Sequence, residues 1–125
     1  MEEKVKVWWD EKDGIGRFIA TDEITEDIIT KVEEMFFKLA EEHDKTDWLI
    51  DLREFSKLPS SHARKRIFDL MKHHAVRKVA VITSKIAIRV VTNFVLVASG
   101  KTADTKFFSN EEEALKWLKK RWVRR

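Results

Sequence analysis

The stretch LIDLREFSKLPSSHARK, residues 49–65, carries the side chains best suited to chemistry. An apolar run ends at Asp51, and a polar loop then leads to Ser60 and Ser61, where a basic helical pattern begins. Ligands of open α/β folds gather at the carboxyl ends of strands, so Asp51 and nearby Arg53 could bind the polar part of a ligand. A serine at a helix start could also hold an anion or accept a phosphate.

The same residues also suit ordinary structural roles. The carboxylate of Asp51 can accept backbone N–H bonds within the loop, from Arg53 and Phe55. The hydroxyl of Ser60 or Ser61 can accept a bond from an N–H that is otherwise unpaired in the first helical turn. We favour these roles, and phosphorylation of Ser60 stays open as the alternative.

Elsewhere the sequence offers little for catalysis. With 3 glycines and no cysteine, it provides neither a glycine-rich phosphate loop nor a thiolate for nucleophilic attack or zinc binding. His62 and His73 lie about 16 Å apart along a helix, which is too far for one metal ion. An Asp69–His73 pair without a nucleophile is typical of a surface contact. We therefore expect a protein that is not an enzyme and uses no metal or cofactor.

The C-terminal sequence LKKRWVRR interleaves tryptophan with cations. Such a pattern suits an anionic membrane surface or phosphate groups. We favour a helix whose tryptophans pack inward and whose cations complement its C-terminal dipole, which leaves nucleic-acid binding as the weakest alternative. The cations are Lys119, Lys120, Arg121, Arg124 and Arg125.

Length and composition indicate one compact domain, residues 1–125. The chain is 43% apolar and 38% charged and has 1 proline, as in a globular protein with short loops. The longest uncharged run, residues 90–99, is about half the length of a membrane-spanning helix. The start MEEKVKVWW is too charged for a signal peptide, and the absence of cysteine suits the cytosol. We expect a soluble cytoplasmic protein that could contact a membrane peripherally.

Alternation of apolar and polar residues over Val5–Trp9 and again over 15–21 predicts two half-buried strands joined by an Asp13-Gly14 turn. Thr25 can cap a helix that ends near His43. Its apolar residues recur at steps of three and four, which predicts one buried stripe of Ile28, Ile29, Val32, Met35, Phe36, Leu39 and Ala40.

The remaining segments alternate between strands and helices. WLIDL and KVAVIT are typical of buried strands, and a helix over 61–74 separates them. The run KIAIRVVTNFVLVAS is rich in β-branched residues, but its length and the following Gly100 favour a buried helix over 86–98. TKFF predicts a last strand, and Ser109 with Glu112 forms a capping box for a final helix. The order ββαβαβαβα predicts an α/β fold with a largely parallel central sheet covered by helices and an antiparallel N-terminal edge hairpin.

This element order, the strands WLIDLREF and KVAVIT and the ending KFFSNEEEALKWL together resemble the SpoIIAA-like group of the STAS superfamily. That fold is related to the lipid-binding CRAL-TRIO domain. In the anti-sigma-factor antagonists of the superfamily, phosphorylation of a serine in the corresponding loop switches partner binding. Ser60 stands at that position, although Pro59 replaces the acidic residue before it and His62 stands where a glycine usually follows.

The resemblance implies a non-enzymatic binding module for a nonpolar ligand, a lipid or a membrane surface. The helix over 86–98 would then form the wall of the pocket, although helices apolar on all sides are ordinarily core. The expected lining is Val90, Val91, Phe94 and Leu96, and the expected polar rim is Asp51, Arg53, Ser60 and Ser61. The alternative is a regulatory domain that binds a protein through Arg53–Arg64, with Ser60 as the target of a kinase. A homo-oligomer is compatible with both.

Overall fold

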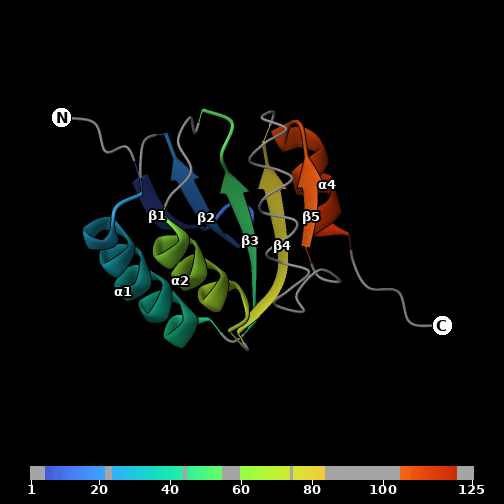
Figure 1. The fold of residues 1–125 in the computed structure, drawn as a ribbon. Coiled ribbons are helices and arrows are strands. Elements are labelled where there is room, and N and C mark those ends of the chain that lie inside the picture. Colours follow the sequence, from blue (N-terminus) through green and yellow to red (C-terminus); the bar gives the residue numbers. More distant parts are fainter. Residues whose placement is uncertain are drawn as a thin grey trace.

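The structure is a computed structural model that describes residues 5–21, 24–43, 45–54, 60–73, 75–83 and 105–120 (Figure 1). The helix expected over 86–98 lies outside these residues. The same holds for the expected contacts of Phe55 and for several expected binding residues, namely Val90, Val91, Phe94, Leu96, Arg121, Arg124 and Arg125.

One sheet organises the fold, and the described residues supply five strands of it that follow one another in chain order. They are β1 (Val5–Asp10), β2 (Ile15–Ala20), β3 (Thr46–Asp51), β4 (Val76–Ile82) and β5 (Thr105–Phe108). β1 pairs antiparallel with β2, and all later neighbours pair parallel. In the turn between β1 and β2, Gly14 adopts a φ of 65°, which an L side chain rarely tolerates. The predicted hairpin and the largely parallel sheet are both confirmed.

Three described helices cover the sheet: α1 (Glu26–Glu42), α2 (Ser61–Met71) and α4 (Glu111–Lys119). Figure 1 shows α1 and α2 against one face and α4 against the other. Thr25 caps α1 as predicted, because its side chain accepts a hydrogen bond from the backbone N–H of Ile28 at 3.3 Å. No helix in the described ranges is long and apolar enough to cross a membrane.

The cap predicted for the last helix is wrong by one residue. The side chain of Asn110, not Ser109, accepts a hydrogen bond from the backbone N–H of Glu113 at 2.9 Å. Asparagine caps a helix as well as serine does. The first turn then consists of Glu111, Glu112 and Glu113, and acidic side chains there interact favourably with the helix dipole.

Trp48 fills the centre of the core between the sheet and α1. Its ring lies over Gly16 of the neighbouring strand, where an added Cβ would come within 2.6 Å of the indole. The indole N–H donates to the hydroxyl of Thr46 at 2.9 Å, and that hydroxyl donates to the carbonyl of Ala75 at 2.8 Å. The polar atom of this buried side chain is therefore satisfied, and Gly16 supplies the space that the ring needs.

Met35 corrects the predicted apolar stripe of α1. The stripe buries Ile29, Val32, Phe36 and Leu39, but Met35 is 41% exposed. Its position on the helix turns it away from the sheet centre toward the edge strand β1, where the sheet ends. Helical spacing alone does not reveal where a sheet stops, so the pattern overestimated the width of the buried face.

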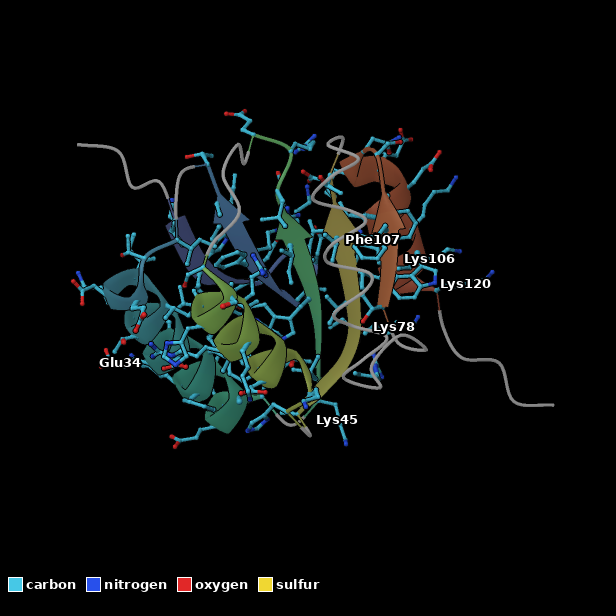
Figure 2. The ribbon with its side chains drawn as sticks, in the orientation of Figure 1. Glu34, Lys45, Lys78, Lys106, Phe107 and Lys120 are labelled. Carbon is cyan, nitrogen blue, oxygen red and sulfur yellow. The ribbon has the colours of Figure 1, made fainter. Side chains whose placement is uncertain are left out.

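Lys78 on β4 is buried beneath the end of α4. Its ammonium group donates to the carbonyls of Trp117 at 3.2 Å and Lys120 at 3.0 Å, and it lies 5.1 Å from the centre of the Trp117 ring. Figure 2 shows Lys78 and Lys120 on the same side of the molecule. A buried lysine therefore adds charge-assisted hydrogen bonds at the carboxyl end of a helix, where the carbonyl of Trp117 also accepts one from the backbone N–H of Lys120 at 3.3 Å.

Replacing Lys78 with methionine should lower the free energy of unfolding by about 2 kcal/mol, because two charge-assisted hydrogen bonds are lost while the carbonyls stay partly buried. Urea unfolding measures the change. Lys106→Met on the adjacent strand β5 is the matched control, since Lys106 is exposed and should change stability by less than about 0.5 kcal/mol. Equal stability of the two variants would contradict this role of Lys78.

Candidate functional site

Asp51 and Arg53, two residues of the expected rim, form a close ion pair. The backbone N–H of Arg53 donates to Oδ1 of Asp51 at 3.1 Å, as the structural interpretation predicted. The guanidinium also binds both carboxylate oxygens, with Nε to Oδ1 at 3.0 Å and Nη2 to Oδ2 at 2.7 Å. The carboxylate at the end of β3 is thus neutralised within its own loop.

Ser60 caps α2. Its hydroxyl oxygen accepts a hydrogen bond from the backbone N–H of Ala63 at 3.1 Å, and its carbonyl accepts one from Arg64 at 2.9 Å. Ser61 lies exposed in the first turn. The capping role expected for this serine pair is confirmed at Ser60. Within the described parts of the chain, no interaction joins either serine to the Asp51–Arg53 pair.

Arg17 and Glu111 extend the Asp51–Arg53 pair across the face of the sheet that α4 covers. Glu111 at the start of α4 lies 3.7 Å from Nη2 of Arg53 and accepts a hydrogen bond from Nη1 of Arg17 at 3.3 Å. Arg17 also bonds Asp10 at 2.7 Å and Asp13 at 3.2 Å. Lys119 at the other end of α4 completes the set, 2.7 Å from Asp13. We call these residues the charged network: Asp10, Asp13, Arg17, Asp51, Arg53, Glu111 and Lys119.

Arg17 is not among the residues predicted for the site, yet the sequence holds a signal for it. Alternation in β2 places Arg17 on the same face as Ile15, which is 2% exposed. A charged residue on an inward face requires partners, because an isolated buried charge is costly. The sequence could therefore have indicated that Arg17 is paired, although not with which carboxylates.

Two carboxylates of the charged network, Asp13 and Asp51, have a lowered pKa. The hydrogen bond from Lys119 lowers the pKa of Asp13 below its usual value, and the effect outweighs that of burial. Burial alone would raise the pKa of Asp51, but the hydrogen bonds and charge of Arg53 bring it below the usual value. A general acid or base needs a pKa near the working pH, so these shifts favour a structural role over catalysis.

Acid should weaken the fold through these two aspartates. Each has a lower pKa in the folded state than in the unfolded state, so its contribution is complete above the unfolded pKa of about 3.9 and is lost as pH falls through the folded pKa. Urea midpoints measured from neutral pH downward should therefore drop below about pH 4. The urea midpoint of the double variant Asp13→Asn, Asp51→Asn should fall less steeply with pH, whereas that of Asp69→Asn, at an exposed position of α2, should follow the parent. If the urea midpoint of the double variant fell with pH as steeply as that of the parent, Asp13 and Asp51 would not be the groups responsible.

The cations expected at the C-terminal helix are only partly described. Lys119 is paired with Asp13, and Lys120 lines the same open cleft as Asp47 and Arg77. There Asp47 accepts hydrogen bonds from two guanidinium nitrogens of Arg77, from Nε at 3.0 Å and from Nη2 at 2.7 Å. Over the described ranges, no three histidine, aspartate or glutamate side chains gather in a way that could hold a metal ion.

An apolar cavity of about 50 Å³ lies between α1, α2 and the sheet. Its volume is about a third of that of an apolar protein cavity that admits benzene, roughly 150 Å³. Every lining side chain is apolar, and the lining comes from the sheet and both helices: Val7, Phe18, Val32, Phe36, Trp48, Ile50, Ile67, Leu70, Val76 and Val79. The guanidinium of Arg66 on α2 links the two helices by donating to both carboxylate oxygens of Glu33 on α1, from Nη2 at 2.6 Å and from Nε at 3.0 Å.

The expected polar rim is divided between the two faces of the sheet. Ser60 begins α2, which covers the face that contains the cavity. Asp51 bonds Arg53, which lies beside Glu111 of α4 on the opposite face. Of the expected rim residues, Ser60 and Ser61 therefore belong to the helix that lines the cavity, and the ion pair belongs to the charged network.

Comparison with known proteins agrees with this architecture. A family model described as SpoIIAA-like matches residues 15–119. Among solved structures, an uncharacterized protein with a SpoIIAA-like fold from Shewanella loihica PV-4 matches with a TM-score of 0.70 and 20% sequence identity, over 91% of each chain. A search of curated proteins found no match. The structural match shows the shared fold, and the family model spans most of the sequence: the chain belongs to the SpoIIAA-like family.

Proposed function

We propose that this chain is a non-catalytic module that binds a nonpolar molecule between α1, α2 and the sheet. The observation that carries the proposal is the cavity of about 50 Å³ with an entirely apolar lining. An unfilled cavity of this size costs about 1 kcal/mol of stability, at roughly 24 cal/mol per Å³. A nonpolar group that fills it recovers contacts that the empty fold lacks.

The lining also defines the chemistry of the ligand. The indole N–H of Trp48, the polar group in the cavity wall, already donates to Thr46, so a polar head would find no free partner there and would be buried at a high cost. The ligand therefore places only its apolar part inside and keeps any polar part in water. A group larger than the cavity requires α2 to move away from α1, which breaks the Arg66–Glu33 contact.

A substitution that fills the cavity tests the proposal. The probes are benzene and lauric acid, added to the isotopically labelled protein and followed by two-dimensional NMR of the amides. In the parent, the amides around Leu70 and Trp48 should shift. Leu70→Phe occupies part of the space and should weaken binding at least tenfold, which is about 1.4 kcal/mol.

The matched control is Leu115→Phe, because Leu115 packs on the opposite face of the sheet, away from the cavity. It should bind both probes as the parent does. The proposal fails if neither probe shifts the parent's amides. It also fails if Leu70→Phe binds as tightly as the parent, since the ligand would then lie elsewhere.

A second function, regulated protein binding, is favoured by one observation at the start of α2. Ser60 and Ser61 are both exposed there, and the first turn carries no acidic residue that would repel a phosphate. Aspartate is as good a helix cap as serine, so Ser60→Asp should keep the fold while adding a negative charge. We expect this variant to capture a different set of proteins from its native extract than the parent does. Identical sets would end this alternative.

A further inference from the structure

β1 is an edge strand with few of the features that protect edges. Among the described strands, the sheet ends at β1 and β5. β5 has 4 residues, and each edge carries one exposed lysine, Lys106 on β5 and Lys6 on β1, so the two edges differ mainly in length. β1 has 6 residues, all in continuous register with β2, and contains neither proline nor bulge. Short edges, bulges, prolines and charges are the usual means of preventing a further strand from pairing. Of the two edges, β1 is the one better able to accept another strand.

A groove runs between β1 and α1. Its apolar surface is formed by Val5 and Val7 from the strand and by Ile28, Val32 and Met35 from the helix. The charged side chains of Lys31 and Glu34 on α1 stand along it, and Lys6 of β1 borders it between Val5 and Val7. A strand added beside β1 would direct every second side chain into this groove, where the exposed Met35 could cover it.

We propose that the occupant of this edge is β1 of a second copy of the chain, paired antiparallel about a twofold axis at Val7. On the groove face, Val5 then lies opposite Trp9 of the second copy. On the other face, Lys6 lies opposite Trp8 of the second copy. Within one copy Lys6 already lies 5.3 Å from the centre of the Trp8 ring, so this pairing extends a contact that the strand makes with itself. β-Branched residues opposite aromatic ones are favourable cross-strand pairs.

The charges beside the groove favour a second copy over an unrelated peptide. Lys31 and Glu34 are both exposed and stand one helical turn apart on α1. The twofold axis runs the two α1 helices antiparallel, so that Lys31 of each copy faces Glu34 of the other. A peptide of one charge sign would attract one of these residues and repel the other. A surface that carries both signs in this order is complementary to itself, as a twofold interface requires.

Pairing of two copies through β1 does not depend on a bound ligand. Val7 and Val32 line both the groove and the cavity, so the two features share a wall. Association is measured by mass and ligand binding by the shifts of amides around Leu70. A protein that stays monomeric but binds the probes contradicts only the dimer, and a dimer that binds no probe contradicts only the ligand site.

Reversing the charges that face each other across the proposed axis tests the dimer. Sedimentation velocity measures the mass of each variant from micromolar to millimolar concentration. The parent should reach twice the mass of the chain. Lys31→Glu places glutamates against glutamates, and Glu34→Lys places lysines against lysines, so each variant alone should dissociate at least tenfold more readily. An equal mixture of the two variants restores opposite charges at both contacts and should form a heterodimer.

Glu41→Lys, exposed on α1 outside the groove, is the matched control and should associate as the parent does. Circular dichroism checks that each variant keeps the fold. Hydrogen exchange adds a second readout, because those amides of β1 that point away from β2 should be protected only where dimers form. A parent that stays monomeric throughout overturns the proposal and leaves a segment of another protein as the occupant. A dimer that neither charge reversal weakens also overturns it, because the interface would lie elsewhere.

Discussion

Replacing Trp48 with alanine should lower the free energy of unfolding by about 4 kcal/mol, the largest effect expected in this chain. The indole is 5% exposed and lies 5.3 Å from the ring of Phe36 between their centres. Its removal enlarges a cavity that already exists, and the surrounding side chains can close only part of the space. It also leaves the hydroxyl of Thr46 without its indole donor. Urea unfolding with linear extrapolation measures the loss.

Trp8→Ala is the control, because Trp8 belongs to the edge strand and is only half-buried. It should cost less than about 1 kcal/mol. Gly16→Ala adds a sharper check, since its new Cβ meets the Trp48 ring at 2.6 Å in the parent. This substitution should cost about 2 kcal/mol in the parent and much less once Trp48 is alanine. Additive effects of the two substitutions would contradict the packing described here.

Replacing Arg17 with methionine should lower the free energy of unfolding by about 3 kcal/mol. The side chain of Arg17 is 15% exposed, and the carboxylates of Asp10 and Asp13 that it binds are 17% and 9% exposed. Methionine keeps the apolar volume of the stem but leaves these carboxylates without their guanidinium partner. Glu111 loses the same partner, so the amides of α4 should exchange faster with solvent.

Lys65→Met is the control for Arg17, because Lys65 makes an ion pair with Asp69 in which both side chains are exposed. This variant should unfold like the parent, since exposed ion pairs contribute little. If Arg17→Met were as stable as Lys65→Met, the charged network would not hold α4 against the hairpin.

Most of the fold is predictable because its signals are local. The hairpin follows from alternation around Gly14, and Thr25 and Ser60 cap their helices through bonds that span only three residues. Each such feature needs only a short stretch of sequence to be recognised. The cap of α4 was misplaced because Ser109 and Asn110 are adjacent and both suit the role.

The charged network and the buried lysine could not be predicted in the same way. Arg17 and Glu111 are separated by 94 positions, and their contact depends on where α4 packs. A lysine near the start of a strand is expected to face solvent, yet Lys78 is only 6% exposed because the end of α4 covers it. In both cases the partner is fixed by tertiary packing, which no local pattern encodes.

The cavity was equally inaccessible to sequence analysis. Its lining residues come from β1 to β4 and from two helices, and each of them has the pattern of ordinary core. Whether such residues fill the space or leave part of it empty depends on the sum of their volumes in three dimensions. The sequence led instead to Val90, Val91, Phe94 and Leu96, whose role in ligand binding stays a prediction.

Native mass spectrometry of the protein, purified without detergent or organic solvent and then incubated with fatty acids of increasing chain length, tests the central proposal most directly. We expect an added mass that organic extraction removes and that Leu70→Phe reduces while Leu115→Phe does not. The bare mass of the chain alone, before and after incubation with every fatty acid, would contradict the proposal that this protein binds a nonpolar molecule.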